Sequence, residues 1–173
     1  MRFKNCPQCG KHLVFREIGD EGRIPFCTHC RRPWFDMFSI CIIVLVVNEK
    51  NEAALLKQSY ISTEYRNLIS GYMKPGETAE EAAAREVCEE IGLELDELKL
   101  TGTYWFGLKD MLMIGFIAKA KKTDFMLSKE VDGADWIPVD EAIQMVHPKG
   151  SVSYALLEIY IEQLKNNTKE QSK

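Results

Sequence analysis

Three glutamates lie close together in the middle of the chain. Glu86, Glu89 and Glu90 are spaced three and four residues apart, so a helix would place them on one face. Neighbouring carboxylates repel one another by roughly a few tenths of a kcal/mol per exposed pair, and a hard divalent cation reverses the sign of that interaction. The spacing therefore fits two readings: a solvated acidic face partly neutralised by Arg85, or an oxygen-ligand site for Mg²⁺ or Mn²⁺.

Four of the six cysteines form two pairs, whose spacing suggests a second metal site. The pairs are Cys6 with Cys9 and Cys27 with Cys30. Two such pairs at this separation are typical of a structural Zn²⁺ held by four thiolates, whereas a redox dithiol does not explain why there are two. A module of this size buries too little apolar surface to fold alone, and bound zinc would supply the missing stabilisation. We therefore expect a zinc ribbon in residues 1–36.

The glutamates require a helix, and residues 79–91 have its sequence signals. Thr78 followed by Glu81 forms a capping box at the start, the intervening alanines favour helix, and Gly92 ends it. One face of this helix is apolar. It consists of Ala83, Val87 and Ile91. The pattern predicts a helix that buries this apolar face and leaves its carboxylates beside a loop that begins at Gly71.

The rest of the chain predicts a sheet and two further helices. Residues 38–47 are continuously apolar and rich in β-branched side chains, as in a buried strand. Other strands are expected at 13–15, 24–26, 53–58, 98–104, 112–120 and 135–138, and helices at 139–146 and 152–164. Residues 37–165 would form the main α+β domain, followed by a disordered tail over 166–173.

Composition and charge narrow the class of protein. Hydrophobic residues make up 46% of the chain and charged residues 28%, which is globular composition. Residues 1–36 contain seven Lys/Arg against four Asp/Glu, a balance of +3 that leaves −7 for the remainder of a chain of net charge −4. This disfavours a general nucleic-acid binder. The longest apolar run, residues 38–47, is too short to span a bilayer, and we expect a cytoplasmic protein with no membrane partner.

Residues 71–93 resemble the Nudix box. Its nine fixed positions are Gly71, Glu77, Arg85, Glu86, Val87, Glu89, Glu90, Gly92 and Leu93. The resemblance to the Nudix hydrolase superfamily implies a mixed β-sheet sandwiched between α-helices, an α/β/α Nudix fold, and cleavage of nucleoside diphosphates linked to another moiety. It implies that Glu86 and Glu90 bind the divalent metal and that Glu89 is a third ligand or the general base. Arg85 is implied to pair with Glu77 and orient the helix.

The order of a zinc ribbon followed by a Nudix domain resembles the NADH pyrophosphatase family. Short segments at 27–31, 41–44 and 134–136 are also similar, as is the Lys-Glu pair at 129–130. This resemblance implies Glu130 as a further metal ligand and a homodimer, whose contact surface we place at residues 33–35. The implied substrate-binding residues are Tyr72 and Phe35, which would stack on the base, together with Ser70 and Ser153. For Phe35, packing where the ribbon meets the domain is an equal alternative.

One segment departs from that family. Residues 103–109 occupy the place of a proline-rich marker associated with nicotinamide dinucleotides and contain no proline. Lys109 also replaces a proline associated with ADP-ribose enzymes. The expected function is metal-dependent hydrolysis of NADH, NAD or a related adenine dinucleotide to two monophosphates. The alternatives are an ADP-ribose or other nucleotide-sugar pyrophosphatase, a non-catalytic nucleotide-binding regulator, and a hydrolase that removes RNA caps. Capped RNA is the only nucleic acid among these expected partners.

Overall fold

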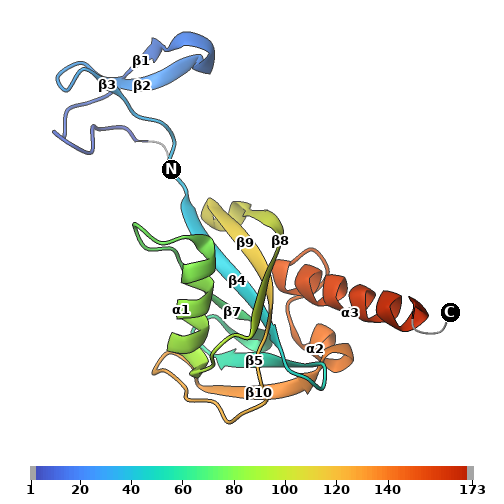
Figure 1. The fold of residues 1–173 in the computed structure, drawn as a ribbon. Coiled ribbons are helices and arrows are strands. Elements are labelled where there is room, and N and C mark those ends of the chain that lie inside the picture. The colour runs from blue at the N-terminus through green and yellow to red at the C-terminus, as the bar shows by residue number, and fades with distance from the viewer. Residues whose placement is uncertain (1–2, 171–173) are drawn as a thin grey trace. The chain divides into compact units, whose positions relative to one another are not determined.

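The structure, a computed structural model, describes residues 3–170 and divides into two compact units (Figure 1). The first unit is Met1–Ser39 and the second is Ile40–Lys173. The division falls close to the boundary expected after residue 36.

The first unit is a small three-stranded sheet. Its strands are β1 (Val14–Glu17), β2 (Arg23–Cys27) and β3 (Arg32–Pro33), with a 3-10 turn, η1 (Gly19–Glu21), between the first two. Adjacent strands are antiparallel, as the expected hairpin requires. Its small core contains Leu13 and the thiols of Cys6 and Cys27, with Phe3 and Trp34 packed against them. Because so little apolar surface is enclosed, the cysteines are the centre of this unit.

The second unit is built on a seven-stranded sheet. The strands are β4 (Ser39–Val47), β5 (Glu52–Gln58), β6 (Ser62–Asn67), β7 (Ile69–Tyr72), β8 (Glu97–Phe106), β9 (Met111–Lys119) and β10 (Gly133–Pro138), and a 3-10 turn, η2 (Gly107–Lys109), joins β8 to β9. The main order is β10-β5-β4-β9-β8, with β6 paired to β5 and β7 paired to β4. The strands β6 and β7 were not predicted from the sequence, since one is mostly polar and the other has only four residues.

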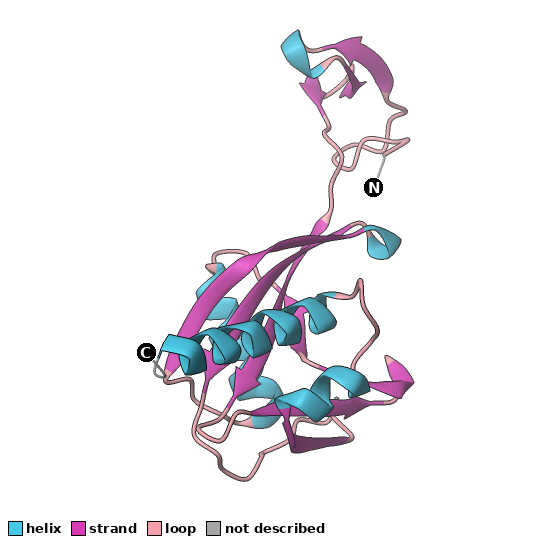
Figure 2. Cartoon of the chain, turned by 90° about the vertical axis from the view of Figure 1, so that its right-hand side faces the viewer, coloured by secondary structure: helices cyan, strands magenta, loops and turns pink. Residues whose placement is uncertain are grey.

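Helices cover both faces of this sheet (Figures 1 and 2). Helix α1 (Ala79–Ile91) packs on one face, and α2 (Val139–Met145) and α3 (Val152–Glu170) pack on the other. Alternate residues of β4 point to opposite faces, so Ile42 contacts the α1 side and Ile43 the α3 side. Helix α3 continues to Glu170, so residues 166–170 of the expected tail are helical; residues 171–173 lie outside the described part.

Helix α1 has the bounds predicted from its caps. The Thr78 side chain accepts a bond from the backbone N–H of Glu81, and the Glu81 carboxylate accepts one from Thr78 in return. Gly92 ends the helix with a left-handed φ of 70°. Backbone N–H groups of Met126 and Ser128 then donate to the last helical carbonyls, so the loop before β10 is bound to the end of α1. Within residues 3–170, no helix is both long and apolar enough to cross a membrane.

Candidate functional site

The three glutamates of α1 share one side of the helix but differ in burial. The Glu86 side chain is 14% exposed and that of Glu89 is 53% exposed, while Glu90 is buried. Strand β7 supports this face, because Gly71 lies opposite the Glu86 carboxylate. A Cβ at Gly71 would lie 2.0 Å from Glu86 Cδ, so only glycine leaves room for the carboxylate.

Arg85 ties this face to the preceding loop. Its guanidinium donates two hydrogen bonds to Glu77, at 2.5 Å and 2.9 Å. It also donates to Glu86 at 2.6 Å, to Glu89 at 3.0 Å and to the backbone carbonyl of Tyr72 at 3.2 Å. The structure therefore brings together the Arg85–Glu77 pair that the sequence suggested. A fork of five donors is needed for so many partners, and lysine could not replace it.

Glu77 is held in its ionised form. The hydrogen bonds from Arg85, followed by one from the backbone N–H of Lys74, lower its pKa to about 2. The same contacts and the Glu86 carboxylate raise the pKa of Arg85 further above its usual value. The pair remains charged over the whole physiological range and braces the loop between β7 and α1 against the helix.

Glu90 is a buried carboxylate with an unsatisfied oxygen. Its Oε2 atom has no hydrogen-bond partner, and burial together with Glu86 and Glu130 raises its pKa to about 8. A buried ionised carboxylate without a partner is costly in free energy. An oxygen-ligated divalent cation beside Glu86 and Glu90 would satisfy both the charge and the free oxygen. The donor set of this face therefore fits Mg²⁺ or Mn²⁺.

Glu130 approaches the same carboxylates from a different segment. It lies two residues after Ser128, whose backbone N–H binds the carbonyl of Glu90 at 3.0 Å, and it contributes to the raised pKa of Glu90. Two neighbours were not predicted from the sequence. The side-chain amide of Gln58 lies near enough to Glu90 to lower its pKa, and burial together with the Glu90 and Glu130 carboxylates raises the pKa of Tyr60. No sequence signal marks them, because a single polar residue that ends an apolar strand is common.

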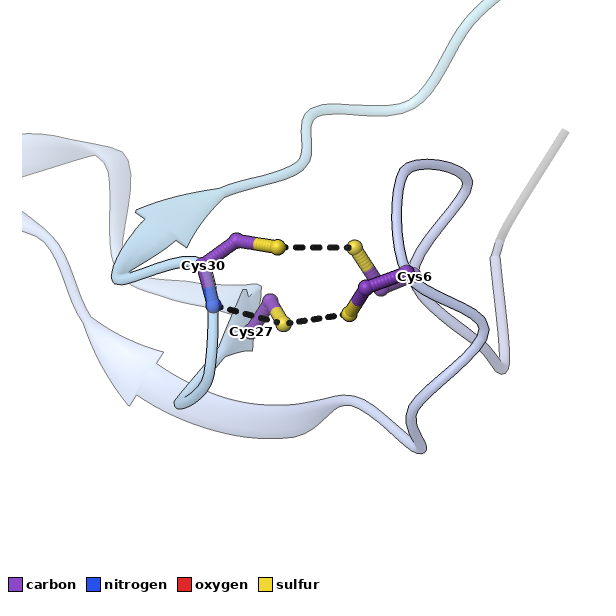
Figure 3. Close-up of side chains that lie close together, drawn as sticks. Cys6, Cys27 and Cys30 are labelled. Carbon is purple, nitrogen blue, oxygen red and sulfur yellow. Dashed lines mark hydrogen bonds between the residues drawn. The ribbon is translucent and has the colours of Figure 1, made fainter.

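The cysteines converge as expected for a metal centre (Figure 3). The four Sγ atoms lie within 4.8 Å of one another, with separations of 3.9 Å for Cys6–Cys30 and 3.6 Å for Cys9–Cys27. A tetrahedron with Zn–S bonds of about 2.3 Å has edges of about 3.8 Å. Hydrogen bonding with Cys9, burial and the neighbouring Cys27 raise the pKa of Cys30 to about 12, a cost that a bound cation would remove.

Within residues 3–170, the four cysteines are the only group of three or more His, Cys, Asp or Glu side chains whose ligand atoms all lie within 4.8 Å of one another. On α1, the Arg85 guanidinium lies between Glu86 and Glu89 and hydrogen-bonds both. Each bond uses one carboxylate oxygen, Oε1 of Glu86 and Oε2 of Glu89, so Arg85 occupies neither carboxylate completely.

The expected substrate-binding residues of the second unit lie on different elements. Tyr72 is 58% exposed at the end of β7 and adjoins the site through its backbone carbonyl. Ser70 is paired with Ile43, so it faces the α3 side of the sheet, and Ser153 lies in the first turn of α3. Phe35 is 48% exposed and belongs to the first unit. The roles of these four residues stay predictions.

A cavity of about 260 Å³ lies between β8 and the start of α3. Its lining includes Tyr104, Trp105, Lys149, Ser151 and Tyr154. Its lining contains one carboxylate, Glu158, and no residue of α1, so we assign the chemistry to the face of α1, where several carboxylates lie together. Tyr104 and Trp105 come from the segment that lacks the proline-rich marker.

The fold and the carboxylate-bearing helix define a class of protein, and comparison with known proteins identifies it. Residues 37–157 match the family model of the NUDIX domain. The chain belongs to the Nudix hydrolase family. Both the expected fold and the expected family are thereby confirmed.

Individual relatives are similar over different parts of the chain. The NAD-capped RNA hydrolase NudC of Escherichia coli (strain K12 / DH10B) is 30% identical over 160 residues, which cover 90% of this chain and 59% of that protein. A NUDIX hydrolase from Nitrosomonas europaea superposes with a TM-score of 0.74 at 23% identity, covering 93% of this chain and 92% of that one. The NUDIX domain of Shewanella oneidensis NrtR, solved with ADP ribose, superposes with a TM-score of 0.64 at 15% identity. The match covers 75% of this chain and 90% of that one. These two structures support the fold alone.

Proposed function

We propose that this chain hydrolyses the diphosphate bond of a nucleoside diphosphate linked to another moiety, with NADH, NAD or a related adenine dinucleotide as the substrate. The products are two monophosphates. The observation that carries the proposal is the carboxylate face of α1, where the buried Glu90 has an unsatisfied oxygen beside Glu86. Such a face gains most from a divalent cation, and a diphosphate needs its negative charge neutralised before water can attack.

We assign different roles in the reaction to different residues. Glu86, Glu90 and Glu130 would hold Mg²⁺ or Mn²⁺, which when bound lowers the pKa of water and neutralises phosphate oxygens. Glu89 is the most exposed of the α1 glutamates at 53%, so it can accept a proton from the attacking water or serve as a further ligand. Glu77 and Arg85 act indirectly, by fixing the loop and helix that carry these groups. The four cysteines would hold a structural Zn²⁺.

A substrate panel tests the proposal. Purified protein with Mg²⁺ or Mn²⁺ would be incubated with NADH, NAD⁺, ADP-ribose, diadenosine polyphosphates, FAD, nucleoside triphosphates and capped RNA. Separation of the products by chromatography identifies the bond that is broken. Release of a nucleoside monophosphate from a dinucleotide is the expected result, and failure to hydrolyse any of these compounds would refute it.

NAD-capped RNA is the second candidate. It is favoured by the 30% identity to NudC, an NAD-capped RNA hydrolase, of whose length this chain spans 59%. A cap presents the same diphosphate as NAD, and a single cap nucleotide needs little positive surface. Comparison of NAD-capped RNA with free NAD⁺ at equal concentration separates the two candidates. ADP-ribose is the corresponding probe for the nucleotide-sugar alternative.

We also propose a homodimer in the cytoplasm. Phe35 is 48% exposed and Pro33 and Trp34 are half-buried, so residues 33–35 present apolar surface that a second copy could cover. Light scattering at micromolar concentration measures the mass directly. A monomeric mass would contradict the proposal.

A further inference from the structure

The turn between β5 and β6 brings two polar side chains to the carboxylate face of α1. Gln58, the last residue of β5, is 2% exposed. Its Nε2 donates to the hydroxyl oxygen of Tyr60 at 3.4 Å, and its amide lies near enough to Glu90 to favour the ionised carboxylate and lower its pKa. One buried amide therefore acts on both Glu90 and Tyr60.

The turn is held in place from two sides. The backbone N–H of Ile61 donates to the carbonyl of Gln58 at 2.9 Å, which closes the turn. Both the backbone N–H and the hydroxyl of Ser59 donate to the Asp132 carboxylate, and the N–H of Asp132 donates to the carbonyl of Lys57. Asp132 belongs to the segment that carries Glu130. The turn that carries Tyr60 is thus tied to the segment that carries Glu130.

Tyr60 is unusual among the aromatic residues near this site. It is 68% exposed, yet Glu90, Glu130 and, more weakly, Glu86 all act on its hydroxyl electrostatically. An exposed tyrosine among carboxylates gains little from packing. Its hydroxyl oxygen already accepts from Gln58, so the remaining O–H is available as a donor.

We propose that Tyr60 is a further substrate-contacting residue, whose hydroxyl donates to a phosphate oxygen of the diphosphate, and that Gln58 is a positioning residue for both Tyr60 and Glu90. This proposal rests on the proposed function, since it requires a diphosphate beside the α1 carboxylates. A neutral donor suits this place: it can bind an anionic oxygen without forming an ion pair with the glutamates. The buried amide of Gln58 in turn restricts the rotamers of the two groups it binds.

Removal of the Tyr60 hydroxyl alone tests the contact. Tyr60→Phe should lower kcat/KM about tenfold or more on the best substrate, the scale of a lost hydrogen bond to a charged group. The affinity for Mn²⁺, measured from the resonance signal of the free ion, should not change. The melting temperature should fall by no more than a few degrees, the scale of the one hydrogen bond that Gln58 loses. Tyr65→Phe is the matched control, because Tyr65 lies on the same hairpin and its ring contacts His147. Its kinetics should equal those of the unmodified chain.

Gln58→Met keeps the length of the side chain and removes its donors. Because Glu90 then loses its interaction with the Gln58 amide, Mn²⁺ binding should weaken about tenfold. The affinity is measured at a temperature well below unfolding. A role in packing alone would lower the melting temperature and leave Mn²⁺ affinity unchanged. That result would overturn the positioning role.

The outcomes separate this proposal from the proposed function. If the unmodified chain hydrolyses a substrate and Tyr60→Phe is equally active, the hydroxyl contact is wrong and the hydrolase remains. If Tyr60→Phe is normal but Tyr60→Ala is impaired, the ring stacks on a base, and the phosphate contact is again wrong. If no compound is hydrolysed, calorimetry with ADP-ribose and Mg²⁺ decides: weaker binding by Tyr60→Phe supports the contact, and equal or absent binding overturns it.

Discussion

The backbone of β7 at Gly71 lies directly against the Glu86 carboxylate. A Cβ added at Gly71 would lie 2.0 Å from Glu86 Cδ and 2.1 Å from its Oε1. The glycine of the Nudix box is therefore explained by space, since its φ does not lie in the left-handed region. Any side chain at this position must displace a proposed metal ligand.

The first prediction follows from this contact. Gly71→Ala should move Glu86 and lower turnover at least tenfold, the scale expected when a positioning contact is lost. Overpacking should also cost about 1–3 kcal/mol of stability. Turnover, Mn²⁺ affinity and the melting temperature measure these effects.

Gly102→Ala is the matched control. Gly102 lies in β8 without a positive φ, and a Cβ there would approach only the Tyr104 hydroxyl at 4.0 Å. If Gly71→Ala bound Mn²⁺ as tightly as Gly102→Ala, the steric argument would be wrong.

The sequence predicted helix α1 better than its surroundings. Its bounds at Ala79 and Ile91 follow from local signals, the capping box at Thr78 and the left-handed Gly92, which act within one helical turn. Strand β7 is short and gains its structure from pairing with β4, so no periodicity marks it. Helix α3 continues past Leu164 through Asn166, Asn167 and Thr168, which are weak helix formers, so local propensity did not predict this extension.

Tertiary contacts account for the parts of the site that the sequence did not reveal. Gln58 and Tyr60 reach Glu90 only because Asp132, more than seventy positions along the chain, fixes their turn. In contrast, Glu77 and Arg85 are eight residues apart across one loop, and their pairing was predicted. The zinc ligands were likewise predicted because each pair is a local motif.

The second prediction concerns zinc. Protein purified without added zinc should contain about one equivalent, because four thiolates leave no open coordination position. Cys27→Ser should lose the metal and unfold the first unit, whose apolar core around the cysteines is small. Elemental analysis and thiol titration measure both. Cys88→Ser, at an exposed position on α1, serves as control and should retain the zinc. Metal-free protein with four rapidly reacting thiols would contradict the assignment.

The third prediction is a dependence of stability on pH. The folded pKa of Glu90, about 8, lies above its ordinary value of 4.5, so the folded state binds this proton more tightly than the unfolded state. Its contribution to stability is therefore fully present below pH 4.5 and is lost as the pH rises towards 8. Without added Mg²⁺, Glu90→Gln should gain a few degrees in melting temperature relative to the unmodified chain between about pH 6 and pH 8.

Added Mg²⁺ should reduce this gain, because the cation stabilises the ionised carboxylate of the unmodified chain. Comparing variant and unmodified chain at each pH cancels the titration of other groups. A difference in melting temperature that stays constant across this range would show that Glu90 ionises normally.

The fourth prediction concerns recognition of the base. Tyr72→Ala should raise KM on the order of tenfold with little change in kcat, since stacking on a base is worth about 1–3 kcal/mol. Phe35→Ala should behave similarly if it is the second stacking partner. Phe15→Ala, which removes a comparably exposed ring from β1, is the control. Unchanged KM values of Tyr72→Ala for every accepted substrate would remove Tyr72 from the binding site.

The last prediction concerns the carboxylates themselves. Glu86→Gln and Glu90→Gln keep the shape of each side chain but remove a negative charge, so each should lower turnover on the order of a hundredfold or more. KM should change less, because the aromatic contacts are untouched. Hydrolysis should stop when divalent metal is withheld and return with Mg²⁺ or Mn²⁺, but not with Zn²⁺. Near-normal turnover in both variants would mean that the metal lies elsewhere and that α1 is not the catalytic element.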